Sequence, residues 1–215
     1  MPLIRTVLFD LDGTLIDSIG LIIDSYRHTL SVHGLPPRSD EEWLRGIGTP
    51  LRTQFAELVE DASMMEELIA TYRAYNLAHH DSRVSVYAGV VDVVRAVKQA
   101  GCATGLVTSK NRHGALRGLA IAGLVDAIDI LVCADDVTQP KPHREPVDRA
   151  VALLGADSTT TVYVGDSIHD MQSGRSAGVR TAAVLWGPFT REELAPSGPD
   201  YWLSRPEELL TLINS

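Results

Sequence analysis

The sequence predicts an α/β protein: a doubly wound parallel sheet covered by helices, with a small helical bundle inserted after the first strand. An early apolar run, residues 6–9, is typical of a short buried strand. The stretch from about 18 to 81 carries helix signals and no strand signal. From Gly89 onward, short apolar strands alternate with helices, which is typical of a parallel sheet buried on both faces. A length of 215 residues allows one large or two small domains.

The helical stretch divides into four predicted helices. The first begins near Asp17 or Ser18, residue types that often cap helix N-termini, and stops at Gly34. Pro50 suits the first turn of another helix. Two further helix starts are marked by capping boxes, Ser39 with Glu42 and Ser63 with Glu66. Four short helices without a strand signal predict a small bundle.

The rest of the chain alternates strands and helices. The predicted strands cover residues 103–107, 130–133, 161–164 and 181–185. The predicted helices cover residues 90–101, 111–122, 146–154, 170–177 and 206–213. The early strand belongs to the same sheet, so the helical stretch is an insertion. Ligand sites of such sheets lie at the carboxyl ends of the strands.

Composition excludes several classes of protein. Apolar residues make up 45% and charged residues 22%, which is enough apolar material for a sizeable core. The sequence contains no run of eighteen apolar residues, so no membrane span is expected. Asp10 and Asp12 interrupt the early apolar run, so no signal peptide is expected either. A formal net charge of −9 argues against nucleic acid or an anionic membrane as partner. Cys102 and Cys133 lie in apolar segments and are expected to be core residues of a reducing compartment.

Reactive side chains follow four of the predicted strands. In chain order they are Asp10 and Asp12, then Thr108 and Ser109, then Lys141, then Asp166 and Asp170. Residues i and i+2 of an extended segment point the same way, so Asp10 and Asp12 can face one ligand. Each feature alone has an ordinary explanation, such as a turn, a loop lysine or a helix cap. Their common position at one sheet edge is what indicates a site.

This set of residue types favours phosphoryl transfer. Two neighbouring carboxylates can divide the work, one attacking as a nucleophile and the other carrying a proton. A third carboxylate, Asp166, would repel them unless a cation lay among them, and hard oxygen ligands beside a phosphate favour Mg²⁺. Thr108 supplies a hydroxyl and an exposed backbone N–H, and Lys141 a mobile positive charge, both suited to phosphoryl oxygens.

The motifs resemble those of the haloacid dehalogenase superfamily, over nearly the whole chain. Residues 10–18 resemble its first motif, Thr108 its second, Lys141 its third and residues 165–170 its fourth. The third motif often reads Lys-Pro-Asp-Pro, whereas here it reads Lys-Pro-His-Arg at residues 141–144. The resemblance implies a Rossmann-like core domain, residues 1–15 plus 86–215, and an α-helical cap domain, residues 16–85.

The same resemblance implies a role for each motif residue. Asp10 would be the nucleophile that forms an aspartyl-phosphate, and Asp12 the acid for the leaving group and then the base for water. The implied Mg²⁺ ligands are Asp10, the backbone carbonyl of Asp12, and Asp166. The implied phosphoryl-binding residues are Thr108, Ser109 and Lys141. Asp170 would steady either Lys141 or a metal-bound water.

Within the superfamily the chain resembles the phosphoglycolate-phosphatase-like group, and its pyrophosphatase branch in residues 72–76, 80–82 and 135–138. This implies a cytoplasmic enzyme acting on a small phosphorylated metabolite or pyrophosphate. Glycines beside Arg45 would let a cap loop approach a ligand closely, so Arg45 or Arg52 is a candidate for binding the far end of the substrate. The segment His79-His80-Asp81 is interpreted as a solvated helix end, because consecutive helix residues face different ways.

Three alternatives stay open. A phosphomutase of the β-phosphoglucomutase type needs a cap group that assists Asp12, often a histidine, where this chain has Ile19-Gly20-Leu21. A haloacid dehalogenase attacks carbon and needs neither a cation nor the pair Asp12 and Asp166. A non-catalytic phosphate-binding module would be expected to have lost Asp10, Asp12 or Lys141, and all three are present.

Overall fold

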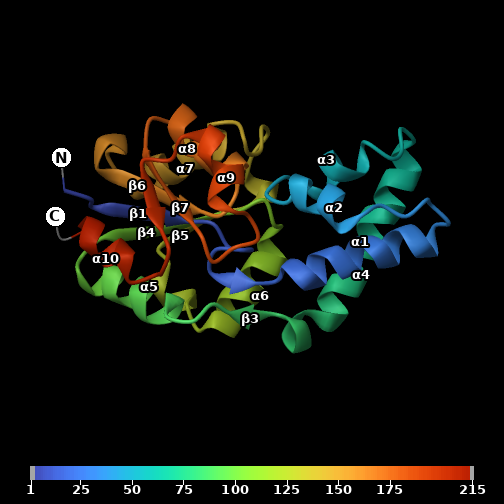
Figure 1. The fold of residues 1–215 in the computed structure, drawn as a ribbon, viewed down its shortest axis with the longest axis horizontal. Coiled ribbons are helices and arrows are strands. Elements are labelled where there is room, and N and C mark those ends of the chain that lie inside the picture. Colours follow the sequence, from blue (N-terminus) through green and yellow to red (C-terminus); the bar gives the residue numbers. More distant parts are fainter. Residues whose placement is uncertain (1–2, 214–215) are drawn as a thin grey trace.

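The computed structural model describes residues 3–213 and shows a six-stranded parallel sheet between layers of helices (Figure 1). The spatial order is β5-β4-β1-β6-β7-β8, and every neighbouring pair runs parallel. The strands are β1 (Thr6–Phe9), β4 (Ala103–Val107), β5 (Ile130–Val132), β6 (Thr161–Gly165), β7 (Arg180–Val184) and β8 (Tyr201–Leu203). The predicted fold class is therefore confirmed. The sequence analysis missed β8, a three-residue edge strand too short to show a period.

Both faces of the sheet are covered, which explains the unbroken apolar run of β1. Val7 and Phe9 pack into the cluster formed with α5 and α6, whereas Leu8 faces the opposite cluster, which contains Val147 of α7. The core helices are α5 (Val90–Gln99), α6 (Arg112–Ala122), α7 (Glu145–Leu154), α8 (Ile168–Ser176), α9 (Arg191–Leu194) and α10 (Glu208–Ile213). Short 3₁₀ turns cover Val125–Ala127, Ala134–Asp136, Ser158–Thr160 and Ala195–Ser197.

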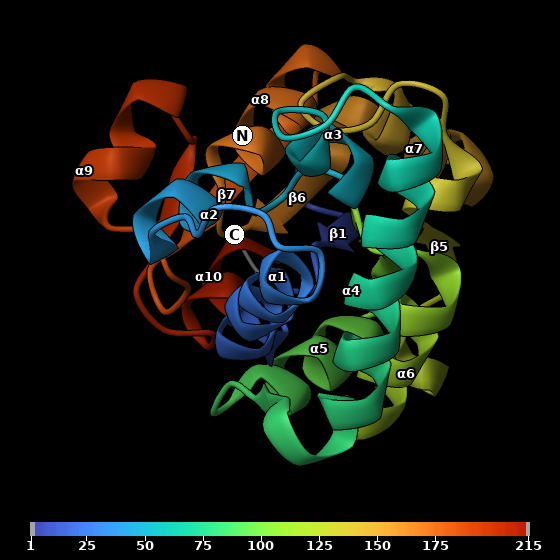
Figure 2. The same ribbon diagram turned by 90° about the vertical axis from the view of Figure 1, so that its right-hand side faces the viewer.

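The helical cap consists of α1 (Ile19–Val32), α2 (Asp40–Gly46), α3 (Leu51–Phe55) and α4 (Ala62–Arg83). It lies at one end of the molecule, and Figure 2 views the molecule from this end. The cap has its own core, in which the ring of Tyr26 stacks on Trp43 with centroids 4.1 Å apart. Phe55 packs edge-on against this pair and against Tyr72, whose ring is tilted by 50° to that of Tyr26, so aromatic burial holds the four helices together.

The two predicted capping boxes of the cap had different outcomes. The box of Ser39 and Glu42 at the start of α2 is confirmed. The box of Ser63 with Glu66 is wrong, because α4 begins after Asp61, whose carboxylate accepts a hydrogen bond from the Met64 N–H at 2.8 Å. An aspartate two residues earlier satisfies the first turn equally well.

Two very short strands connect the cap to the sheet. β2 (Ile16–Asp17) pairs antiparallel with β3 (Ser85–Val86). Two residues are too few for a sequence period, so the sequence analysis missed both strands. The predicted domain boundaries at residues 15–16 and 85–86 fall on this pair, and the division into two domains stays a prediction.

Cys102 and Cys133 are both buried in the main core and form no disulfide, as their apolar surroundings predict. Among the helices of residues 3–213, none has the length and hydropathy needed to cross a bilayer.

Candidate active site

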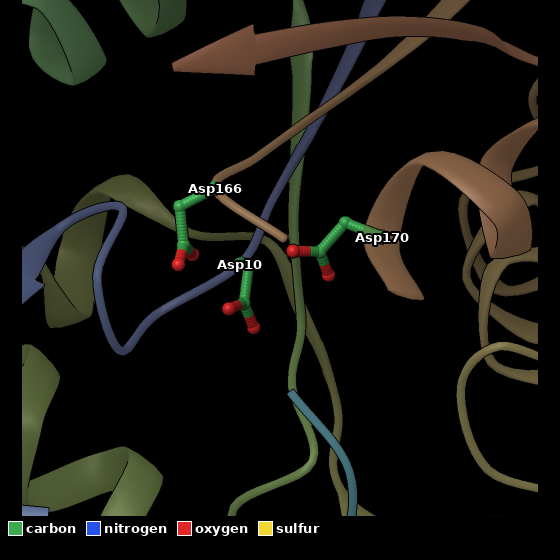
Figure 3. Close-up of side chains that lie close together, drawn as sticks. All are labelled: Asp10, Asp166 and Asp170. Carbon is green, nitrogen blue, oxygen red and sulfur yellow. The ribbon is translucent and has the colours of Figure 1, made fainter. Parts of the chain in front are cut away.

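Three carboxylates meet at the carboxyl edge of the sheet (Figure 3). Asp10 follows β1, Asp166 follows β6, and Asp170 lies in the first turn of α8. One oxygen of each lies within 4.8 Å of the others, and all three residues are buried. The strands β1 and β6 are hydrogen-bonded neighbours, so the residues that follow them emerge side by side.

Lys141 lies inside this cluster of negative charge. Its ammonium donates hydrogen bonds to Asp10 Oδ1 at 2.9 Å, to Asp170 Oδ1 at 2.6 Å and to the Tyr163 hydroxyl at 3.0 Å. Burial disfavours the ammonium, but the charges of Asp10 and Asp170 outweigh burial and raise the pKa of Lys141 above its usual value. The expectation of a mobile loop lysine is therefore wrong. Only 2% of Lys141 is exposed, and hydrogen bonds hold its ammonium in place.

Asp170 is the second carboxylate that binds the ammonium of Lys141. Its second oxygen accepts hydrogen bonds from the backbone N–H of Ser167 at 3.0 Å and from the Ser167 hydroxyl at 2.7 Å. Burial raises the pKa of Asp170, but Lys141 and these hydrogen bonds lower it by a larger amount. The net pKa therefore lies below the usual value. The anionic form of Asp170 is therefore favoured beside Lys141, one of the two placements that the resemblance implies.

The negative charges of the other two carboxylates, Asp10 and Asp166, are less fully balanced by positive groups and hydrogen bonds. Burial raises the pKa of Asp10 to about 7, although Lys141 opposes this rise. Burial and the charges of Asp170 and Asp10 raise the pKa of Asp166 well above its usual value. Asp166 Oδ1 accepts a hydrogen bond from Thr14 at 2.9 Å, but its buried Oδ2 has no partner within the described chain. An unpaired carboxylate oxygen among like charges fits a hard divalent cation such as Mg²⁺.

Asp12 is bound by two other groups. Its carboxylate accepts hydrogen bonds from Lys110 Nζ at 2.9 and 3.2 Å and from the Ser18 hydroxyl at 2.5 Å. Burial raises the pKa of Asp12, but Lys110 and Ser18 hold it below the usual value. Gly13, with φ of 86°, turns the chain beside Asp166, where a Cβ would lie 2.5 Å from a carboxylate oxygen. Sequence reasoning missed Lys110, although it directly follows Ser109 in the second motif.

The structure changes the interpretation of the second motif. Thr108 is buried at the end of β4, and its backbone N–H donates to the Val132 carbonyl at 2.9 Å, so the expected free N–H is wrong. The Ser109 hydroxyl donates to the Gly48 carbonyl of the cap at 2.6 Å. Gly48 has φ of 96°, and a Cβ there would lie 2.8 Å from Ser167 Oγ, so this glycine lets the cap approach the core edge, whereas a close approach to a ligand stays a prediction. Phosphoryl binding by Thr108 and Ser109 stays a prediction.

A cavity of about 1010 Å³ lies between the sheet edge and the cap. The core lines it with Asp10, Asp12, Thr108, Ser109, Lys110 and Lys141. The cap lines it with Arg52, Arg73, Asn76 and His80, among others. Arg52 forms an ion pair with Glu66. Arg45 does not line the cavity: its side chain is exposed, and its Nε donates to the Glu41 carbonyl within α2 at 3.3 Å.

The expected solvated helix end at His79-His80-Asp81 is wrong for its middle residue. His80 is 1% exposed, whereas Asp81 is exposed. One turn of α4 thus presents neighbouring residues to opposite environments, and only the packing of α4 against α1 decides which one is buried.

Comparison with known proteins gives a consistent result. The family model for haloacid dehalogenase-like hydrolases matches residues 7–184. The chain is 41% identical over 210 residues to the pyrophosphatase PpaX of Anoxybacillus flavithermus, covering 98% of this chain and 97% of that one. It is also 41% identical over 211 residues to the pyrophosphatase PpaX of Bacillus cereus, with the same coverage.

Solved structures share the fold over almost the full length. A structure described as a predicted phosphatase from Clostridium acetobutylicum superposes with a TM-score of 0.88 at 26% identity, covering 99% of both chains. A hydrolase from Pseudomonas syringae superposes with a TM-score of 0.89 at 22% identity, covering 98% of both. The second likeness shows the fold alone.

Proposed function

This chain belongs to the haloacid dehalogenase-like hydrolases and is a phosphatase or pyrophosphatase of that family. We propose that it is a Mg²⁺-dependent enzyme that hydrolyses pyrophosphate through an aspartyl-phosphate on Asp10. One observation carries the proposal. Asp10 is buried between Lys141 and Asp166 in a cavity that also contains the carboxylate of Asp12. A nucleophile, a second carboxylate and a fixed cation are the groups that phosphoryl transfer requires.

In the first step, an oxygen of the Asp10 carboxylate attacks phosphorus and the bond from phosphorus to the leaving oxygen breaks. Asp12 gives its proton to that oxygen. In the second step, Asp12 takes a proton from water while the water oxygen attacks phosphorus, and the bond to Asp10 breaks. Lys141 and Thr108 offset the charge that develops on the phosphoryl oxygens. The products are two phosphate ions, and both carboxylates return to their starting states.

Asp12 must gain a proton before it can act as an acid. Lys110 and Ser18 keep it ionised in the structure described here. An anionic substrate in the same cavity attracts the Lys110 ammonium, which weakens the contact with Asp12 and raises the pKa of that carboxyl. Substrate binding would thereby prepare the proton donor.

The residues present fit a Mg²⁺ ion, because Asp166 Oδ2 is buried without a partner beside Asp10. Asp10, the backbone carbonyl of Asp12, and Asp166 would hold it. The ion would supply positive charge that brings a carboxylate nucleophile and an anionic phosphate together. We also propose a cytoplasmic location, for which the two buried cysteines without a disulfide are the support.

A second substrate class has an observation of its own. The cavity is large for pyrophosphate, and part of its wall is apolar, formed by Ile22, Leu51 and Ile69. Such a wall suits a phosphate ester of an organic compound.

Phosphate release from pyrophosphate, p-nitrophenyl phosphate and a panel of phosphorylated metabolites, each with Mg²⁺ or with EDTA, tests both candidates. Mg²⁺-dependent release that is fastest with pyrophosphate supports the proposal. Release that is fastest with an organic ester favours the second class. No release above a blank with any substrate would contradict both.

A further inference from the structure

His80 is a buried polar side chain that the mechanism above does not use. It lies in the last turn of α4, is 1% exposed and lines the cavity. Within residues 3–213, Nε2 has no hydrogen-bond partner, and the one polar contact of Nδ1 is a 3.4 Å approach to the carboxylate of Asp81. A buried imidazole without partners is unfavourable unless a ligand supplies one, because its hydrogen bonds to water are lost on folding.

The surroundings of His80 fix which nitrogen is available. Nδ1 lies 3.4 Å from a carboxylate oxygen of Asp81. That carboxylate is held by Arg117 of α6, which donates two hydrogen bonds to it, at 2.7 and 2.8 Å. Arg117 thus orients Asp81, and Asp81 faces Nδ1, which leaves Nε2 for a ligand in the cavity.

The charges near His80 indicate which part of a substrate lies there. Asp12 and Lys110 act on the His80 ring electrostatically and line the same cavity. Asp12 is the group that protonates the leaving oxygen, whereas Lys141 and Asp10 lie on the side of the transferred phosphoryl group. A ligand atom near His80 therefore belongs to the leaving group.

We propose that His80 Nε2 forms a hydrogen bond with the leaving phosphate of a diphosphate substrate, and that the Arg117–Asp81 pair holds the ring in the orientation for this bond. The inference rests on the proposed function and assigns the leaving-group side of its site. Steps of four along α4, from Tyr72 through Asn76, place His80 rather than His79 on the buried face of the helix.

The test compares two amide variants that place nitrogen differently. Glutamine places its amide near the position of Nε2, and asparagine places its amide near that of Nδ1. We expect His80→Asn to lower kcat/KM for pyrophosphate roughly ten- to hundredfold, as for a lost hydrogen bond to a charged group. His80→Gln should retain most of the wild-type value. With p-nitrophenyl phosphate, whose leaving group carries no phosphate, both variants should stay close to wild type.

Three controls keep the outcomes distinct. His79→Gln alters the neighbouring histidine, which does not line the cavity. It should change kcat/KM for neither substrate. Asp81→Asn should also lower kcat/KM for pyrophosphate. Because Asp81 is exposed, this substitution removes no buried side chain. Thermal unfolding midpoints show whether each variant is folded. If His80→Asn does not fold, the Asp81→Asn ratio between the two substrates decides.

Each result has a clear meaning. Equal losses on both substrates, or no loss on pyrophosphate, would overturn the role of His80 while the phosphatase activity stands. Wild-type turnover of p-nitrophenyl phosphate without turnover of pyrophosphate would overturn the leaving-phosphate contact and leave the second substrate class. No wild-type turnover of either would overturn the proposed function, and this inference with it.

Discussion

The core edge and the cap form opposite walls of one cavity, but they place their polar residues in different ways. At the core edge, Asp10, Thr108 and Asp166 follow parallel strands, so the sheet brings them together. In the cap, Arg52 lines the cavity and Arg45 does not, although they stand seven positions apart on neighbouring helices. A strand end fixes where a residue lies, whereas a helix residue's environment depends on how the helix is rotated in its packing.

The two walls also differ in the type of their ion pairs. Lys141 and its two carboxylates are buried, so they are little screened by solvent. Arg52 and Glu66 are both more than half exposed. The core wall is therefore held by buried ion pairs, whereas the ion pair of the cap wall competes with solvent. Four experiments test this contrast.

The largest effect is expected at the nucleophile. Asp10→Asn should reduce turnover by at least about 10³-fold, because an amide is a far weaker nucleophile than a carboxylate. Initial rates of phosphate release measure this. Asp148→Asn on α7, whose carboxylate pairs with Arg144 at the surface, serves as the matched control and should retain full activity. Appreciable turnover by Asp10→Asn would remove Asp10 from this role.

The next effect concerns stability. Lys141→Met should lower the free energy of unfolding by about 3–5 kcal/mol, because it leaves buried carboxylates without a cation. Arg52→Met in the cap should lower it by less than about 1 kcal/mol, because that pair is exposed to solvent. Urea unfolding in EDTA measures both. Similar losses in the two variants would contradict the contrast between the walls.

A pH dependence of stability should appear in the core wall. The folded-state pKa of Asp10 is raised from 3.8 to about 7, so folding favours its protonated form. The resulting stability is complete below about pH 4 and is lost as pH rises through 7. In EDTA, the unfolding midpoint of the wild type should therefore fall relative to that of Asp10→Asn between pH 5 and 8. Parallel pH profiles would refute the raised pKa.

The smallest effects are expected among the cap arginines. Arg52→Ala should raise KM for pyrophosphate about three- to fivefold, a modest change because its charge is partly screened by solvent. Arg45→Ala should leave KM unchanged within about twofold, because its side chain lies outside the cavity. Steady-state kinetics measure both. A larger effect of Arg45 would show that the cap presents a different surface to the substrate than the one described.

Much of the core could be predicted from the sequence because its signals are local. The apolar run of β1 and the alternation after Gly89 predict a parallel sheet, and parallel strands place Asp10 and Asp166 at one edge. Contacts between distant segments have no such signal. The pairing of Lys110 with Asp12 spans 98 positions, and that of Arg117 with Asp81 spans 36. Neither partner marks the other in the sequence.

The chemical groups at the strand ends could be read from the sequence, because covalent order and strand direction fix them there. The environment of each side chain depends on the tertiary structure: Lys141 is buried and paired with two carboxylates, Asp166 keeps one oxygen without a partner in the described chain, and His80 of the cap is buried. The physical reason is that burial, charge and hydrogen bonding depend on the three-dimensional distances between side chains, and packing sets those distances.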